Sequence, residues 1–450
     1  MEQRLRGGRF GRTSRTVTLP ALDMRLRVTT PGLFALPWRT PLGEWDATEV
    51  PLRDVPVGPS RHLVRFVDCD GALWALKELP VRIAQKEYAV LRDLEARSLP
   101  AVRAAGLVVQ PLEDTAILVT RYLERSWQYR RLLMRMPADL SAHRERLLDA
   151  MASLLVDLHR NGVFWGDCSL ANTLFSRDGQ VLQAWLVDAE TSEIHPRLTA
   201  GQRQYDLDIL VENVAGGLLD VASRLELPEE DHPALFEQAE SVASRYTALW
   251  ETLQAEPVFS FADRYQIESR IRGLHELGFA VDEVNLRAGA DNTVRLKVAV
   301  AARRFHASQL HDLTGLDVGE GQARILLADL HAYAHHICQE TRGDVSTPMV
   351  APRWTTEVLR PASVRAHQAL GGVGDPIQAY CDLLEVRWLL SEKARQDVGE
   401  QAALEALAKR AAPAGSAARM AIADVPTGQI PALTPALLRE LGGPPQPRPE

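Results

Sequence analysis

Residues 166–172 read Gly-Asp-Cys-Ser-Leu-Ala-Asn, and residues 185–188 read Trp-Leu-Val-Asp. The first stretch places the carboxylate of Asp167 and the carboxamide of Asn172 five positions apart in an expected loop. The second stretch ends an apolar strand with the carboxylate of Asp188. Phosphoryl transfer needs such a set, because one carboxylate must receive the acceptor's proton while an asparagine and an aspartate hold magnesium on the phosphates.

The bulk composition excludes several classes of protein. The chain has 450 residues, 46% of them apolar, which is enough for two or three domains with a sizeable core. A net charge of −8 argues against a nucleic-acid binder or a protein of anionic membranes. The sequence has no apolar run of transmembrane length, no visible secretion signal and no Cys-x-x-Cys pair among its four cysteines, so we expect a reduced cytoplasmic protein.

Lysine is rare in this chain, with only five among 51 basic residues. One of them, Lys77, lies in an apolar stretch that we expect to be the second of two strands between Leu63 and Leu79. A lysine that remains in such a strand indicates a need for a compact ammonium group. The alternative is a solvated strand residue.

The helix expected from about Val81 to Ala96 offers a partner for this lysine. Its apolar residues recur at helical spacing on one face, and Glu87 is the only charged residue in that stripe. A carboxylate there would be costly unless it were paired, so we predict that Glu87 pairs with Lys77. The alternative is an edge position in water.

The region that follows contains further predicted elements. They are a strand from Thr115 to Thr120, a long helix from about Ser141 to Arg160, a hairpin turning at Asp178-Gly179 and a helix from Asp206 to Leu225. Asp206 and Asp208 open the last helix. Either they cap it, or one of them braces the loop of Asp167.

A domain boundary is expected near residues 255–257. Beyond it, the pattern predicts a helix at about 262–277, a hairpin turning at 289–292 and helices at 306–313, 321–340 and about 375–409. The last forty residues are rich in alanine, proline and glycine and are typical of a disordered tail.

The order of these features resembles the protein-kinase-like fold over about residues 57–225. In this resemblance Lys77 matches the strand lysine that contacts the ATP phosphates, and Glu87 matches its helical partner. Asp167 matches the catalytic-loop aspartate that accepts the hydroxyl proton, whereas Asn172 and Asp188 match the residues that hold Mg²⁺. The resemblance therefore implies ATP and Mg²⁺ as cofactors.

Two further segments are assigned by the same resemblance. Tyr122 and Leu123 fall where the adenine-binding hinge should be. Gly58 falls in the loop that should cover the phosphates, and it is the single glycine there, which makes this loop the poorest match.

Some residues differ from the protein-kinase pattern, and these differences indicate which branch of the kinase-like fold the chain resembles. Trp165-Gly166 precedes Asp167 where protein kinases have His-Arg, and Gly-Asp is similar to the aminoglycoside phosphotransferase and lipopolysaccharide (heptose/Kdo) kinase branches. The segment from Ala189 to Tyr205 is short and has no Ala-Pro-Glu anchor for a peptide substrate. The whole chain also looks like a bacterial family that joins a lipopolysaccharide-kinase-like domain to an uncharacterised C-terminal domain.

We therefore expect an α+β protein, with a two-lobed protein-kinase-like domain followed by a mostly helical C-terminal domain that contains a β-hairpin. The expected divisions are an N-terminal arm and lead-in (1–45), the kinase-like domain (46–255), the C-terminal domain (256–410) and the tail (411–450). The function implied is ATP-dependent transfer of phosphate to a hydroxyl of a small-molecule, sugar or lipid acceptor. A pseudokinase or nucleotide-binding scaffold and an atypical protein kinase remain the alternatives.

Overall fold

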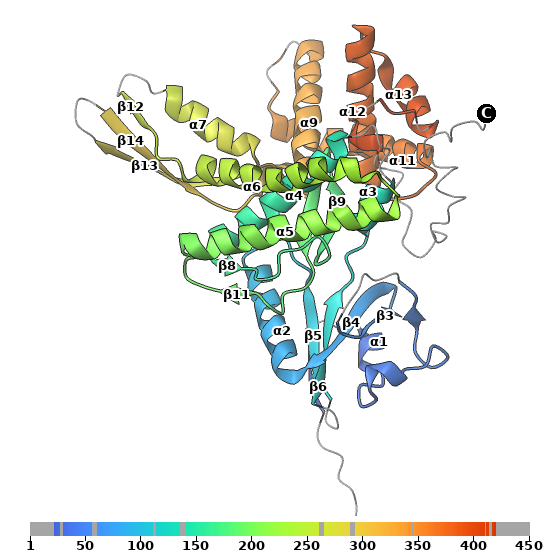
Figure 1. Cartoon of the computed structure of the whole chain (residues 1–450). Coiled ribbons are helices and arrows are strands. Elements are labelled where there is room, and N and C mark those ends of the chain that lie inside the picture. The colour runs from blue at the N-terminus through green and yellow to red at the C-terminus, as the bar shows by residue number, and fades with distance from the viewer. Residues whose placement is uncertain are drawn as a thin grey trace, which may run out of the picture.

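The computed structural model of the chain describes most of its residues. These are residues 22–27, 30–55, 61–110, 114–135, 141–260, 265–288, 293–341, 343, 345–409, 411–413 and 416–419. Figure 1 shows a sheet lobe near the N-terminus, a helical lobe beside it and a C-terminal part dominated by upright helices. This arrangement confirms the expected α+β class with two lobes and a mostly helical C-terminal region.

The sheet lobe is a six-stranded antiparallel sheet in the order β1-β5-β6-β4-β3-β2. Its strands are β1 (Asp23–Leu26), β2 (Leu52–Arg53), β3 (Val64–Cys69), β4 (Ala72–Pro80), β5 (Ala104–Val109) and β6 (Thr115–Arg121). Its helices are α1 (Pro31–Phe34), a 3₁₀ turn (Leu42–Glu44) and α2 (Val81–Ala96).

Both faces of the sheet are buried at strands β5 and β6, because these two strands are apolar on both sides. Along β6, Ala116 and Leu118 face the core that α2 covers, whereas Ile117 and Val119 face a second core beneath the tryptophans of the lead-in. The predicted strand pair and the helix after it are confirmed, and the helix has the predicted bounds.

The helical lobe is built on α4, whose regularly spaced leucines are fully buried as predicted. Its helices are α3 (Tyr129–Arg135), α4 (Ser141–Arg160), α5 (Ala200–Arg224) and α6 (His232–Gln254), with a 3₁₀ turn at Glu229–Asp231. Its strands are β7 (Ser126–Gln128), β8 (Val163–Phe164), β9 (Thr173–Asp178), β10 (Val181–Leu186) and β11 (Glu193–Ile194).

Helix α5 begins earlier than the predicted start at Asp206. It begins at Ala200, because Thr199 and Gln202 form a capping box in which each side chain bonds the other residue's backbone N–H. The predicted start was therefore six residues too late. The correction places Asp206 inside the helix rather than at its cap.

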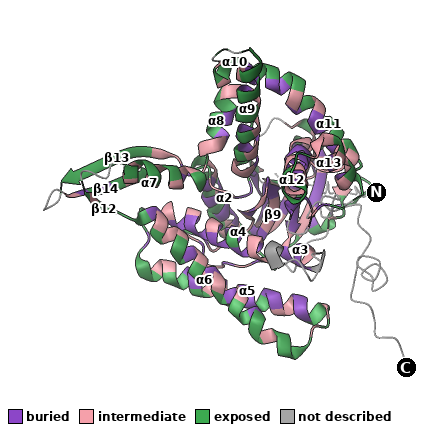
Figure 2. Ribbon diagram, turned by 90° about the horizontal axis from the view of Figure 1, so that it is seen from above, coloured by how far each residue is buried: buried purple, intermediate pink, exposed green. Residues whose placement is uncertain are grey.

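The C-terminal region combines a small sheet with a group of helices. Its strands are β12 (Val258–Ser260), β13 (Val281–Ala288) and β14 (Thr293–Val300), and its helices are α7 (Tyr265–Glu276), α8 (Phe305–Thr314), α9 (Glu320–Thr341), α10 (Thr347–Trp354), a π-helical turn (Thr355–Leu359), α11 (Arg360–Ala369), α12 (Pro376–Ala394) and α13 (Gly399–Ala408). Figure 2 shows the sheet and α7 extending away from the upright helices. The predicted hairpin is confirmed as β13–β14, with β12 added along its other edge.

Some predictions fall on residues that the structure does not describe. These are the N-terminal arm, Gly58, the hairpin turn at 289–292 and the tail beyond residue 419. Among the described helices, none is both long enough and apolar enough to cross a bilayer.

Candidate functional site

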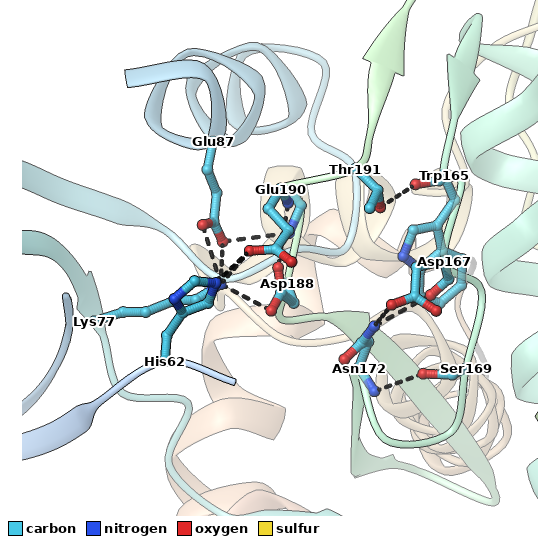
Figure 3. Close-up of polar contacts among 11 residues, drawn as sticks. His62, Lys77, Glu87, Trp165, Asp167, Ser169, Asn172, Asp188, Glu190 and Thr191 are labelled. Atoms are coloured by element: carbon cyan, nitrogen blue, oxygen red, sulfur yellow. Dashed lines mark hydrogen bonds and ion pairs between the residues drawn. The ribbon is translucent and has the colours of Figure 1, made fainter. Parts of the chain in front are cut away.

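Lys77 and Glu87 form the predicted ion pair between β4 and α2. The Nζ atom of Lys77 lies 3.1 Å from Oε2 of Glu87 and 2.8 Å from Oδ2 of Asp188. Figure 3 shows the three side chains directed toward one another. The Glu87 residue is only 1% exposed, so its carboxylate depends on this partner. The structure therefore brings together three of the residues that the sequence singled out.

The electrostatics of this group follow from one ammonium shared by two carboxylates. Burial raises the pKa of Glu87 to about 7, although the charge of Lys77 opposes the shift. Burial by itself would lower the pKa of Lys77, but Glu87 and Asp188 together raise it above its ordinary value. The negative charge of Asp188 adds to the upward shift in the pKa of Glu87, because a second carboxylate nearby disfavours the ionised form.

We expect Glu87 to make folding stability depend on pH. Its folded-state pKa of about 7 lies above the ordinary value of 4.5, so between these limits the folded chain holds a proton that the unfolded chain has released. The free energy of unfolding, taken relative to Glu87→Gln, should therefore decrease as pH rises through this window. Urea denaturation of both proteins at a series of pH values measures this; a constant difference would mean that Glu87 is already ionised.

Two residues that the sequence reasoning missed complete the ionic group. Oε2 of Glu190 lies 3.7 Å from Lys77 Nζ and 3.1 Å from Nε2 of His62. The carboxylates of Glu87, Asp188 and Glu190 have oxygens within 4.8 Å of one another. The only sequence signal was the glutamate standing two positions after Asp188, where protein kinases have glycine.

Asp167 and Asn172 are joined inside the loop that precedes β9. Nδ2 of Asn172 donates to Oδ2 of Asp167 at 3.0 Å and to the Asp167 carbonyl at 3.2 Å. The backbone N–H of Asn172 also donates to Ser169 Oγ at 3.2 Å, which tightens the same turn. The carboxamide nitrogen is therefore directed at Asp167, and the oxygen of the same group is the atom suited to a cation.

The β9–β10 hairpin connects this loop to Asp188. Its strands pair from Asp178↔Val181 to Thr173↔Leu186, so the residues that flank the hairpin emerge side by side at its open end. The N–H of Val187 donates to the carbonyl of Asn172 at 3.1 Å, which continues the pairing beyond the strands. Asn172 and the residue before Asp188 are thus backbone neighbours.

Asp206 braces the loop of Asp167 through hydrogen bonds to the backbone just before that residue. Its Oδ2 accepts from the N–H of Trp165 at 2.7 Å, and its Oδ1 accepts from the N–H of Gly166 at 2.8 Å. Asp208 is exposed and bonds only to Gln204 in the described part of the chain. The sequence left open whether these aspartates cap the helix or brace the Asp167 loop, and the structure shows that Asp206 braces the loop.

A buried histidine and tyrosine extend this brace, and the sequence reasoning did not find them. Nε2 of His159 lies 3.0 Å from Asp206 Oδ2, and its Nδ1 lies 2.8 Å from the hydroxyl of Tyr246. Burial lowers the pKa of His159 and raises that of Tyr246 to about 12. The neutral imidazole therefore donates from Nε2 to the carboxylate and accepts the tyrosine O–H at Nδ1.

The backbone conformation and close packing of Gly166 both favour glycine. Its φ is +80°, and a Cβ atom would lie 3.2 Å from both Cβ and the carbonyl oxygen of Thr191. Thr191 in turn donates its hydroxyl to the Trp165 carbonyl at 2.9 Å. This close approach ties the Asp167 loop to the segment after Asp188.

Tyr122 and Leu123 lie between the two lobes, directly after β6 and before β7. The N–H of Tyr122 donates to the Leu73 carbonyl at 3.0 Å, and the Leu123 carbonyl accepts from Ser126 Oγ at 2.7 Å. The predicted hinge position is therefore the connection between the lobes. Gly58 lies outside the described residues.

Two family models match consecutive segments of this chain. The model of the lipopolysaccharide kinase (Kdo/WaaP) family matches residues 72–238, and that of a domain of unknown function (DUF4032) matches residues 248–411. A solved structure described as WaaP in complex with acyl carrier protein is similar at 18% identity and a TM-score of 0.30, over 43% of this chain and 90% of that one. A search of curated proteins found no match.

Proposed function

The chain joins a lipopolysaccharide kinase (Kdo/WaaP) family domain, residues 72–238, to a domain of unknown function, residues 248–411, and on this basis we propose that it is an ATP-dependent phosphotransferase. The proposed acceptor is a hydroxyl group of a small molecule, sugar or lipid. One observation carries the proposal: the Lys77–Glu87–Asp188 group lies beside the Asp167–Asn172 pair, and the two are linked through the β9–β10 hairpin (Figure 3).

Each residue of this group has a distinct proposed role. Lys77, held by Glu87, orients the phosphates of ATP. Asp188 and the carboxamide oxygen of Asn172 supply the oxygen ligands that Mg²⁺ prefers, and the ion would neutralise charge on the phosphates. Tyr122 and Leu123, at the connection between the lobes, would contact the adenine.

Asp167 is the proposed general base. Asn172 donates to its Oδ2, which fixes the carboxylate and leaves Oδ1 to accept the proton of the attacking hydroxyl. Most of the rate acceleration would come from positioning and charge neutralisation, because the protein forms no covalent bond to the phosphate in this reaction class.

The acceptor is proposed to be a small molecule, sugar or lipid rather than a peptide. Only a short segment separates Asp188 from the start of α5 at Ala200, and Thr191 and Ser192 in it both donate to the Trp165 carbonyl. A segment tied down in this way offers little surface for a peptide to lie on.

A second candidate is a scaffold that binds no nucleotide, and one observation favours it. Lys77 already has three carboxylates within 4 Å, including Glu190, which also contacts His62. In a scaffold this ion group would itself balance the lysine charge. In an enzyme, the phosphates and Mg²⁺ would redistribute these contacts.

Nucleotide binding separates the phosphotransferase from a scaffold of this kind, whereas Mg²⁺-dependent ATP consumption separates it from a pseudokinase or scaffold that binds nucleotide. We expect ATP to bind the full-length protein in the presence of Mg²⁺ and to bind much more weakly when EDTA removes the metal. Lys77→Met should weaken binding by about tenfold or more, because a hydrogen-bonded charge on the phosphates is lost. Isothermal titration calorimetry measures both effects.

Lys86→Met is the matched control, because Lys86 is exposed on α2 next to Glu87. Its affinity for ATP should equal that of the wild type. Wild-type protein that binds no ATP with Mg²⁺ would rule out the phosphotransferase and leave the scaffold.

A further inference from the structure

The turn of the β9–β10 hairpin is buried in the C-terminal domain. Asp178, the last residue of β9, accepts the N–H of Gly321 at 2.8 Å and the N–H of Gln322 at 2.8 Å, both at the start of α9. The Asp178 carboxylate thus accepts hydrogen bonds from N–H groups in the first turn of α9, which have no acceptor within their own helix.

Glycines allow this approach between the two backbones. Gly179, at the turn, has φ +62°, and a Cβ atom there would lie 2.7 Å from the carbonyl oxygen of Gly321. A Cβ atom on Gly321 would overlap the carbonyl oxygen of Asp178. The hairpin and α9 therefore make backbone-to-backbone contact, which leaves little room for the turn to shift.

Side chains of helix α12 also form hydrogen bonds and an ion pair with the same part of the hairpin. Gln378 accepts from the N–H of Gly179 at 2.9 Å and donates to its carbonyl at 3.0 Å. Asp382, one turn further along α12, forms a two-pronged ion pair with Arg177 of β9, with one contact at 2.8 Å. Both side chains are buried, at 2% exposure for Arg177 and 1% for Asp382.

The same helix also reaches the connection between the lobes. Asp375, at the start of α12, lies 3.4 Å from Nη1 of Arg125, two residues after Leu123. Asp375, Gln378 and Asp382 follow helical spacing and so share one face of α12. This face contacts the kinase-family domain both at the hinge segment and at the hairpin.

We infer that the C-terminal domain positions the magnesium-binding residues of the kinase-family domain, an inference that rests on the proposed function. The open end of the hairpin carries Asn172 on one side and Val187-Asp188 on the other, and six pairs of facing residues connect it to the turn that α9 and α12 hold. Helices α9 and α12 hold that turn, and so they set the separation and orientation of the two proposed ligands. Gln378 and Asp382 are positioning residues in this scheme and do not touch substrate.

The test uses Asp382→Asn in the full-length protein, with Asp397→Asn as the matched control. Asp397 also forms a two-pronged pair with an arginine, Arg387 of α12, but at an exposed site. In Asp382→Asn we expect the backbone amides of β9 and β10 to exchange hydrogen about tenfold faster, with α4 unchanged. The Mg²⁺ concentration for half-maximal ATP binding should rise by about tenfold, and the control should match the wild type in both respects.

Unchanged exchange in β9 and β10 would overturn the inference. So would an unchanged Mg²⁺ dependence, whether exchange is faster in the hairpin alone or across the whole chain, because the contact would then be purely structural. If Asp382→Asn does not fold, Arg177→Lys, which keeps the charge and loses the two-pronged geometry, replaces it. If the wild type binds no ATP, the proposed function fails, and the exchange of β9 and β10 alone decides whether the C-terminal domain holds the hairpin.

Discussion

Asp167→Asn is expected to lower phosphate transfer by about 10²–10⁴-fold while leaving ATP affinity unchanged. The carboxamide has nearly the shape of the carboxylate and retains an oxygen that can accept from Asn172 Nδ2, as Asp167 does at 3.0 Å. It cannot take the proton of the attacking hydroxyl at neutral pH. The loss should therefore appear in kcat rather than in the dissociation constant of ATP.

The measurement pairs ATP titration calorimetry with ADP formation on an acceptor that the wild-type protein uses. Asp208→Asn is the control, because Asp208 is exposed on α5 and lies outside the ionic group. If Asp167→Asn turned over at the wild-type rate, another group would have to be the base. A loss of ATP binding in Asp167→Asn would instead indicate that this carboxylate holds the metal.

The parts of the site that depend on local pattern could be predicted from the sequence. Glu87 was found because a single charge in an apolar helical stripe needs a partner, and Lys77 lies in the strand immediately before that helix. The hairpin was found because an Asp-Gly turn separates two short apolar runs. In each case the deciding residues lie close together in the chain.

Contacts between distant parts of the chain could not be predicted in this way. Asp206 and Asp208 have the same chemistry, and only the packing of α5 against the Asp167 loop shows that the first faces the core and the second faces water. Arg177 and Asp382 are 205 residues apart, and each reads locally as an ordinary surface charge. The contact between the C-terminal domain and the hairpin could therefore not be predicted from the sequence.

Prolines also prevented one helical stretch of the C-terminal domain from being predicted. Pro352 lies inside α10 and Pro361 at the start of α11, and a π-helical turn joins the two helices. Proline removes a backbone donor and interrupts the regular period, so this stretch does not look helical in the sequence. Burial of Trp354 at the junction shows that packing stabilises it.

Asp206→Ala is expected to lower the free energy of unfolding by about 3–5 kcal/mol. The Asp206 residue is fully buried, and its loss leaves three donors without an acceptor: the N–H groups of Trp165 and Gly166 and the Nε2–H of His159. Because two of these donors belong to the backbone just before Asp167, the loop should also lose its fixed position. Transfer activity per folded molecule should therefore fall as well, although Asp206 touches no substrate.

Asp206→Asn and Asp208→Ala make this prediction specific. The asparagine keeps one acceptor oxygen, so its unfolding free energy should lie between those of the wild type and Asp206→Ala. Asp208 is exposed on the same helix, and its replacement by alanine should change stability by less than about 0.5 kcal/mol. Urea denaturation of the four proteins gives the comparison. Equal stabilities for the two alanine variants would mean that the buried carboxylate does not hold the loop, because only Asp206 has backbone donors that depend on it.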